Sequence, residues 1–456
     1  MLRLFSKIIK EDNFLSLSGN LVIAVLGFGG FGLLARTLDP EDFAAWVLFI
    51  SCGSLIEMLR YGITNNALVR FLSGASKTKK DQYIGSNMLI SLIATMCISA
   101  MLITLKIGFS NVIEGSSYEL FFDWYPVLAF LNLPLNNALV VQQAYMNYGR
   151  ILVVKVLNSG LFFCAVLMNF VVFDLSIDQL IYIYLGINSL VSIICITKSW
   201  DGLKLITKST KTTIKTLLNF GKYSTFTLIG TNLLRNADIW IISISPFGSA
   251  AVALFSIPLK LTEIQQIPLR SFAATAFPKM SKASMEGRTK DVRKYFNTYA
   301  GALTYLFIGM SLVTFLFAEE FVILVSGYQY LDHQLADVSI TVLVKILSIY
   351  GLLLPIDRMT GIGLDSVNRP KINAFKVCVM LITNLIGDLT AVFVFESLEL
   401  VAISTIIFTS MGIVLGSYFL NKEFEVSPRA IFKEGNSFYR SIWFQYRQLT
   451  KRIGTF

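Results

Sequence analysis

Residues Phe43–Val69 read FAAWVLFISCGSLIEMLRYGITNNALV, an apolar stretch that contains one acid and one base, Glu57 and Arg60. The stretch is long enough to cross the hydrocarbon core of a bilayer as a helix, which takes roughly 20 residues. Residues three apart lie on one face of a helix, and a charged side chain at bilayer depth costs roughly 2.5–3.5 kcal/mol. We therefore expect a spanning helix whose Glu57–Arg60 face points into the protein.

Apolar stretches of this kind recur along the whole chain, which is 54% hydrophobic and only 15% charged. In lipid, only helices and closed barrels satisfy their backbone hydrogen bonds, and the alternating pattern of barrel strands is missing. The sequence therefore predicts an all-α polytopic membrane protein. We expect twelve transmembrane helices, at residues 14–35, 43–69, 85–105, 119–145, 151–172, 179–197, 219–244, 250–275, 296–318, 337–357, 372–394 and 400–420.

Basic residues between these spans predict that both termini are cytoplasmic. With that orientation the outer loops hold only Arg36 and Lys106, and the lysines and arginines of the other connections lie inside. Cytoplasmic loops of membrane proteins carry such an excess of Lys and Arg. The net charge of +10 therefore reflects orientation and contact with anionic lipid, and no nucleic acid is expected as a partner.

The connection 201–218, rich in Lys and Thr, divides the chain into two sets of six spans. We expect an N-terminal six-helix lobe at 1–200 and a C-terminal six-helix lobe at 219–420. When the chain is shifted onto itself so that Glu57 meets Glu263, several neighbouring residues also match. Such parallel repeats build many transporters, whose site lies between the halves near the midplane of the membrane.

Residues 421–456 are expected to form a separate, basic, amphipathic cytoplasmic tail. Apolar residues recur there at helical spacing with bases between them: Phe438, Ile442, Trp443, Tyr446, Leu449 and Ile453, and Arg440, Arg447, Lys451 and Arg452. Amphipathic helices of this composition lie in the membrane interface. We predict a helix on the inner leaflet, and the alternative is a disordered basic tail.

Other predicted spans also carry charges, and in two of them an acid and a base again stand three residues apart. These residues are Arg235, Asp238, Lys260, Glu263, Arg270 and Lys345. Either they only lock helix to helix, or they line a hydrated cavity. For Arg60 and Arg270, which lie toward the inner surface, a further alternative is that the side chain snorkels to the headgroups.

The fourth span is unusually rich in amides and prolines: Asn132, Asn136, Asn137, Gln142, Gln143, Pro126 and Pro134. These amides could line a hydrated path or bond to neighbouring helices. Enzyme chemistry is not indicated, because the sequence has no His cluster, metal-ligand spacing or phosphate-loop pattern. We expect no catalytic residue, metal or organic cofactor.

Three sequence segments resemble a known family: LLARTLDPEDFAAW (Leu33–Trp46), MLRYGITNNALVRFLS (Met58–Ser73), and NADIWII, AVALFSIPLKL and FPKMS within Asn236–Ser281. They are similar to Wzx-type polysaccharide or O-antigen flippases of the multidrug/oligosaccharidyl-lipid/polysaccharide (MOP) exporter superfamily. One departure is that a Gly-x-Tyr common in that family is replaced by Ala45–Trp46 and by Ala253–Phe255.

This resemblance implies a MATE-like fold and a flippase of the bacterial inner membrane. Its substrate would be an undecaprenyl-diphosphate-linked oligosaccharide, moved to the outer leaflet by alternating access for O-antigen, capsule or exopolysaccharide. The bases implied to face the diphosphate and sugars are Arg60, Arg235, Lys260, Lys345 and Arg270. The acids implied to support them, or to bind H⁺ or Na⁺ as a coupling ion, are Glu57, Asp238 and Glu263. A polysaccharide polymerase and a chain-length regulator would be further partners.

Three other functions stay open at this point. A MATE-type multidrug antiporter would use an acidic cavity for cationic drugs, whereas bases here are at least as numerous as acids. A polysaccharide polymerase or ligase would need a long outer loop, which this sequence lacks. A scaffold without transport activity would not need so many charges inside the membrane.

Overall fold

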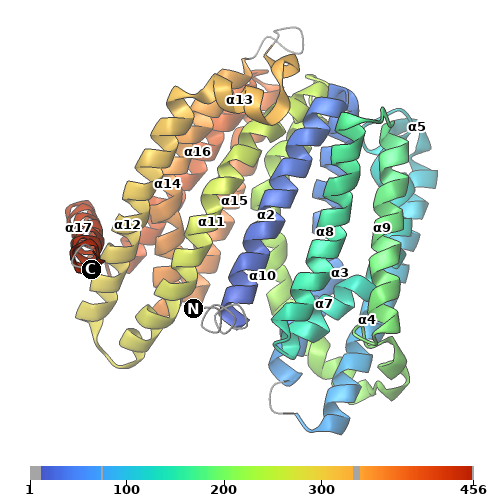
Figure 1. Ribbon diagram of the computed structural model, residues 1–456, viewed down its shortest axis with the longest axis horizontal. Coiled ribbons are helices and arrows are strands. Elements are labelled where there is room, and N and C mark those ends of the chain that lie inside the picture. The colour runs from blue at the N-terminus through green and yellow to red at the C-terminus, as the bar shows by residue number, and fades with distance from the viewer. Residues whose placement is uncertain (1–11, 73–74, 332–338, 454–456) are drawn as a thin grey trace. The chain divides into compact units, whose positions relative to one another are not determined.

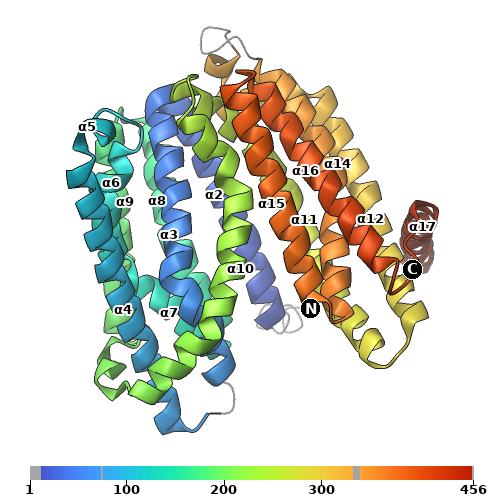
Figure 2. The ribbon, with the colours of Figure 1, turned by 180° about the vertical axis from the view of Figure 1, so that it is seen from behind.

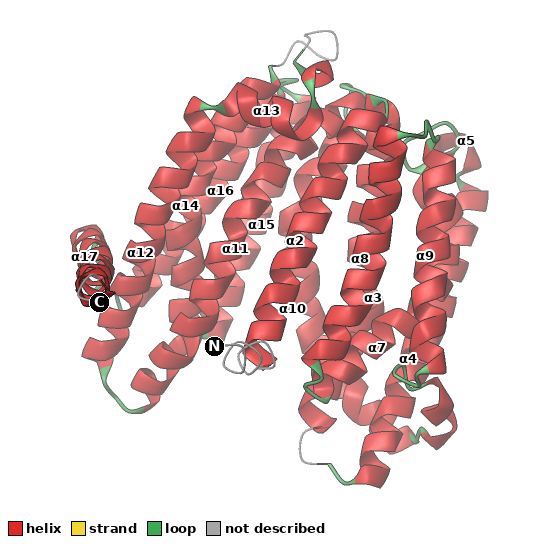
Figure 3. Cartoon of the chain, viewed as in Figure 1, coloured by secondary structure: helices red, strands yellow, loops and turns green. Residues whose placement is uncertain are grey.

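The computed structural model describes residues 12–72, 75–331 and 339–453 of the chain, and over these residues it is helical, with loops and turns between helices (Figure 3). The long helices are α2 (Asp12–Thr37), α3 (Pro40–Leu72), α4 (Lys77–Gly108), α6 (Glu119–Leu131), α7 (Leu133–Ala144), α8 (Tyr148–Val171), α9 (Ile177–Thr197), α10 (Lys211–Ser243), α11 (Ala250–Met285), α12 (Thr289–Leu316), α14 (Ile340–Ser366), α15 (Pro370–Phe393), α16 (Leu398–Leu420) and α17 (Pro428–Ile453). The short ones are α5 (Ser110–Ile113), η1 (Leu203–Lys208), α13 (Ala318–Ser326) and η2 (Tyr328–Tyr330). The predicted all-α class is confirmed.

In the described part of the chain, eight helices are long and apolar enough to cross a membrane: α3, α4, α8, α9, α12, α14, α15 and α16. Helices α6 and α7 meet at an angle of 50° and pass the same test together, so the number is nine if this pair is one span, as the sequence predicts. Helices α2, α10 and α11 cover the remaining predicted spans. Helix α11 continues as one helix through Pro258, Pro268 and Pro278.

The chain forms two compact units, and unit 1 comprises Met1–Ser243, Gly248–Ala253 and Leu324–Gln329. Within it α2 packs along α8, and α10 packs along α3. The α10 contact is polar as well as apolar, since the Trp240 indole N–H donates to Ser51 Oγ over 3.1 Å. Because of this packing, unit 1 extends one helix beyond the connection 201–218. The division of the sequence into two six-helix lobes stays a prediction.

The connection that precedes α10 packs closely on α4 in unit 1. Asp201 is buried, and Gly202 adopts a positive φ of 84° that favours glycine. The η1 backbone approaches α4 at Gly85, where a Cβ would lie 2.0 Å from the Leu205 carbonyl oxygen. The hydroxyl groups of Ser86 and Thr213 are 2.7 Å apart. Residues expected to form a linker are thus held against the bundle.

Unit 2 comprises Ile244–Phe247, Leu254–Ile323 and Tyr330–Phe456. Helix α14 packs against α12 and α16, and α15 packs against α16. Aromatic side chains fill its core, among them Phe296 and Phe307, which have no exposed surface. Helix α17 lies across α12 and is seen nearly end-on in Figures 1 and 2. The predicted helical form of the tail is therefore confirmed.

Replacing Gly85 with Ala is expected to destabilise unit 1, because the new Cβ would overlap the Leu205 carbonyl oxygen. Overpacking of this kind costs roughly 1–3 kcal/mol. The measurement is the midpoint of thermal unfolding of the purified protein in detergent. Gly186→Ala in α9 is the matched control: nothing lies within 4 Å of its Cβ position, so the midpoint should not fall. Equal destabilisation by both changes would contradict the packing of η1 on α4.

Candidate functional site

The fourth span breaks in the middle of unit 1. Helix α6 ends at Leu131 and α7 begins at Leu133. Pro134 lies in the first turn of α7 and has no backbone N–H to donate. Carbonyl groups beside such a break need donors from other helices. The Ala129 carbonyl accepts a hydrogen bond from the Arg60 guanidinium. The break therefore creates a place for a base from α3.

Arg60 is fully buried, and each of the three nitrogens of its guanidinium group donates hydrogen bonds. Nη1 donates to Glu57 Oε1 over 3.0 Å and to Asn132 Oδ1 over 3.1 Å. Nε donates to Thr95 Oγ1 over 3.1 Å, and Nη2 donates to the Tyr61 hydroxyl over 2.8 Å. A guanidinium has five N–H donors, and the protein supplies acceptors for all of its nitrogens. In this conformation Arg60 holds α3 to α4 and to the broken span.

Glu57 is partly exposed, with 27% of its side chain accessible, and so is its neighbour Asn136. Its Oε1 accepts hydrogen bonds from Arg60 and Asn132, and its Oε2 accepts one from Asn136 over 2.9 Å. The Tyr125 hydroxyl also donates to Glu57 Oε1, over 3.3 Å. We call Glu57, Arg60, Tyr61, Thr95, Tyr125, Asn132 and Asn136 the Arg60 cluster. The two asparagines thus bond to a neighbouring helix, one of the two alternatives for the amides. The predicted substrate contact of Arg60 stays a prediction, whereas its support of Glu57 is direct.

Unit 2 contains a second same-helix pair on α11. Lys260 Nζ lies 2.7 Å from Glu263 Oε2, and the two side chains are 26% and 31% exposed. This pair is more open than the one on α3, where Arg60 has no exposed surface. The predicted ion pairs Glu57–Arg60 and Lys260–Glu263 are thus formed.

The other predicted bases differ in their surroundings. Arg235 is exposed on α10 whereas Asp238, one turn later, is 4% exposed. Arg270 is exposed on α11 and donates to Gln266 Oε1 over 3.3 Å. Lys345 is half-buried, and its ammonium lies 5.8 Å from the centroid of the Phe315 ring. Arg270 and Lys345 therefore contact side chains of their own unit.

A buried ion pair between α14 and α15 escaped the sequence analysis. Lys376 is 2% exposed, and its ammonium lies 2.7 Å from Asp357 Oδ1 and donates to Thr360 Oγ1 over 3.0 Å. Asn384 and Asp388, also on α15, are fully buried and joined by a 2.7 Å hydrogen bond. The available signal was a charge inside a predicted span. A search for pairs within one helix does not find Lys376, because its partner is on the preceding helix.

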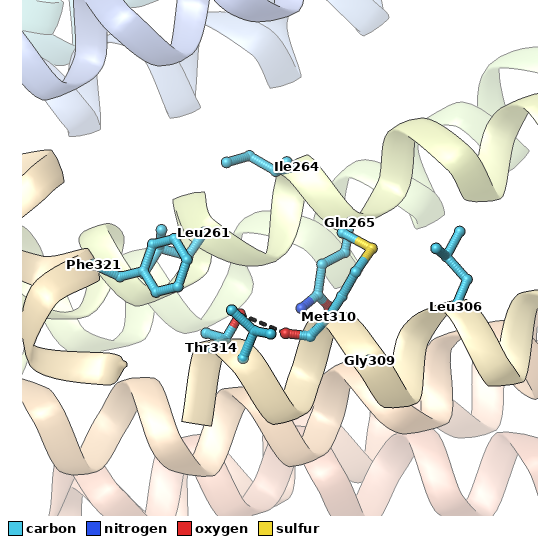
Figure 4. A pocket seen from close by; sticks show the side chains of 9 residues that line it. Leu261, Ile264, Gln265, Leu306, Gly309, Met310, Thr314 and Phe321 are labelled. Carbon is cyan, nitrogen blue, oxygen red and sulfur yellow. Dashed lines mark hydrogen bonds between the residues drawn. The ribbon is translucent and has the colours of Figure 1, made fainter. Parts of the chain in front are cut away.

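A cavity of about 390 Å³ lies within unit 2 between α11, α12 and α13 (Figure 4). Its walls are mostly apolar and include Leu261, Met310 and Phe321, with Gln265 and Thr314 as polar members. No charged side chain lines it, so it is unsuited to a diphosphate. Among the described residues, no group of three or more His, Cys, Asp or Glu side chains could hold a metal ion.

Comparison with known proteins identifies the family. The sequence profile described as polysaccharide biosynthesis protein matches residues 9–284, more than half of the chain. The chain belongs to this family. No match to a curated protein was found.

Solved structures of transporters share the fold of this family member. An inward-facing multidrug resistance MATE transporter of the MOP superfamily aligns with a TM-score of 0.74 and 16% identity, over 88% of this chain and 95% of that chain. The lipid II flippase MurJ in an inward closed conformation aligns with a TM-score of 0.71 and 12% identity, over 94% and 92%. A MOP superfamily transporter from Pyrococcus furiosus aligns with a TM-score of 0.60 and 16% identity, over 91% and 95%. The MATE-like fold predicted from the resemblance is confirmed, and these relatives in fold are transporters and flippases rather than enzymes.

Replacing Arg60 with Gln should destabilise the protein by roughly 3–5 kcal/mol, because it removes the buried base and leaves the partly buried Glu57 carboxylate unpaired. The measurement is thermal unfolding in detergent. Arg270→Gln, on an exposed base, is the matched control and should stay within about 0.5 kcal/mol of the wild type. The double change Glu57→Gln/Arg60→Met should lower the free energy of unfolding less than Arg60→Gln alone, since it removes both charges. Equal losses from the Arg60 and Arg270 changes would contradict a structural role for Arg60.

Proposed function

We propose that this protein is a flippase that moves an undecaprenyl-diphosphate-linked oligosaccharide from the inner to the outer leaflet of the bacterial inner membrane. The observation that carries the proposal is the polysaccharide biosynthesis match over residues 9–284 in a chain that has the fold of a lipid II flippase. The product would enter the assembly of a surface polysaccharide such as O-antigen, capsule or exopolysaccharide. A polysaccharide polymerase and a chain-length regulator would act next on it.

In this proposal, intramembrane bases bind the anionic headgroup. Arg235 and Arg270 are exposed on their helices, and Lys260 keeps a quarter of its side chain exposed beside Glu263. Arginine can bind a phosphate through two parallel hydrogen bonds, whereas lysine acts as a point charge. Lys345 completes the proposed set. The Arg60 cluster contributes rigidity, and it presents Glu57 at the surface of unit 1.

Transport would follow alternating access. The headgroup enters a cavity open to the cytoplasm, the polyprenyl tail stays in lipid, and the cavity then opens to the outside. The membrane potential favours outward movement of an anion by about 2.3 kcal/mol per charge per 100 mV. Glu57, Asp238 and Glu263 are the acids that would bind H⁺ or Na⁺ if transport is coupled to an ion. This proposed role rests on their position among the bases.

The second candidate function is a MATE-type multidrug antiporter, favoured by the fold shared with an inward-facing MATE transporter. A deletion strain separates the two candidates. Loss of the flippase should cause lipid-linked oligosaccharide to accumulate on the cytoplasmic face and should deplete the surface glycan. An unchanged surface glycan together with altered drug sensitivity would favour the antiporter. Loss of a polymerase or a ligase would instead leave lipid-linked glycan on the outer face, unpolymerised in the first case and unligated in the second.

The variant Arg235→Gln/Lys345→Gln should lower flipping at least tenfold, because charge-assisted hydrogen bonds contribute roughly 1.5–3 kcal/mol each and each 1.4 kcal/mol is about tenfold. Arg60 is left intact, since its removal would disturb folding. The measurement is transfer of a fluorescent lipid-linked oligosaccharide across reconstituted vesicles. Lys204→Gln/Lys215→Gln removes the same charge from exposed positions outside the predicted spans and should flip normally. Full activity of the first variant would exclude these bases as the diphosphate site.

A further inference from the structure

Helix α17 carries three different faces over residues 428–444. In a helix, residues three, four or seven positions apart share one face. The packed face is Ile431, Gly435 and Phe438, the aromatic face is Phe432, Tyr439 and Trp443, and the basic face is Arg429, Lys433 and Arg440. At about 100° per residue, the aromatic face lies between the packed face and the basic face. Each face therefore meets a different environment.

The packed face joins α17 to α12 in unit 2. Gly435 lies so close to α12 that a Cβ there would be 2.5 Å from the backbone carbon of Gly301. Ile431 is 2% exposed, and the Tyr439 hydroxyl donates to the Ala302 carbonyl over 2.9 Å. Figures 1 and 2 show α17 running across α12 at this contact. The rings of Phe432 and Tyr439, on the neighbouring aromatic face, also contact Tyr305 of α12. The tail is therefore docked on the bundle through its packed face and the adjoining edge of its aromatic face.

The predicted span places the contact between α17 and α12 near the inner membrane interface. Gly301 follows the start of the predicted span, residue 296, by five residues, and a helix rises 1.5 Å per residue, which gives about 7.5 Å. Interfacial helices bury their apolar face by about 5–10 Å. The end of α12 near Thr289 is cytoplasmic in the predicted topology. In the predicted topology the crossing point thus lies within about 7.5 Å of the inner end of the span.

The other two faces suit that level. Phe432 and Trp443 are 43% and 55% exposed, which is unfavourable in water for side chains of this size. Tyrosine and tryptophan are enriched at membrane interfaces. Arg429, Lys433 and Arg440 are exposed on the neighbouring face. Bases at this level attract anionic lipid, whose headgroups carry the opposite charge.

We propose that α17 is an interfacial anchor that binds anionic phospholipids of the inner leaflet while it is docked on α12. The aromatic face enters the boundary between headgroups and acyl chains, and the basic face contacts the phosphate groups. The anchor would hold the cytoplasmic ends of α11 and α12 at a constant depth. It requires neither the flippase substrate nor the proposed transport activity.

The first test measures the depth of Trp443 in the full-length protein, reconstituted in lipid nanodiscs. Lipids brominated at different acyl positions quench tryptophan fluorescence, and the difference between the wild type and Trp443→Phe isolates Trp443. Quenching should be strongest with bromines near the headgroup end of the chain. Absence of quenching by any brominated lipid, or strongest quenching by bromines at the chain end, would overturn the interfacial placement.

The second test measures how the rate of amide hydrogen exchange in residues 428–444 depends on the charge of the lipid. Each base near an anionic surface strengthens membrane binding by about fivefold. Amide exchange should therefore be more than about tenfold slower in nanodiscs with 30% phosphatidylglycerol than in nanodiscs of phosphatidylcholine alone. Arg429→Gln/Lys433→Gln/Arg440→Gln should lose this dependence. The control variant Lys204→Gln/Lys211→Gln/Lys215→Gln removes the same charge from exposed positions of the connection before α10 and of α10 itself. In this control the exchange rate should still depend on lipid charge. The same response in both variants would overturn the role of the basic face.

Discussion

The five N–H groups of the Arg60 guanidinium impose the main constraint on unit 1. In a medium of low dielectric constant each unsatisfied donor is costly, so a buried guanidinium needs acceptors on several sides. Glu57 and Tyr61 come from its own helix, Thr95 from α4, and the Ala129 carbonyl from the end of α6. The last of these is available because the fourth span breaks at Asn132. One buried base and one broken helix therefore depend on each other.

Charges inside the two units fall into two kinds with different uses. Lys376 is buried against Asp357 of the neighbouring helix, and such a pair can hold α14 and α15 together but cannot meet a ligand without opening. Lys260 and Glu263 share a helix face and stay partly exposed, so their charges are available without disruption of the core. A transporter needs both kinds. In the proposed transport, the first kind would keep the helices rigid and the second would be available to the substrate.

Basic residues that the sequence predicts to be cytoplasmic belong to folded elements in both units. In unit 1 the connection with Asp201 and η1 folds back onto α4, so the lysines of this segment stay close to the bundle. In unit 2 the packed face of α17 places the basic face of this helix beside α12. The positive charge predicted for the cytoplasmic side is thus built into folded elements.

The sequence by itself determined the helical class, the positions of the spans, the pairs Glu57–Arg60 and Lys260–Glu263 and the helical tail, because hydropathy, charge and helical spacing are local properties. It also indicated the family through short segments such as Met58–Ser73. Only the tertiary structure decided that Arg60 is saturated by the broken span, that Lys376 pairs with Asp357, and that α10 packs on α3. Each of these depends on which helices become neighbours, and a repeat of 3.6 residues per turn carries no information about the partner across the interface.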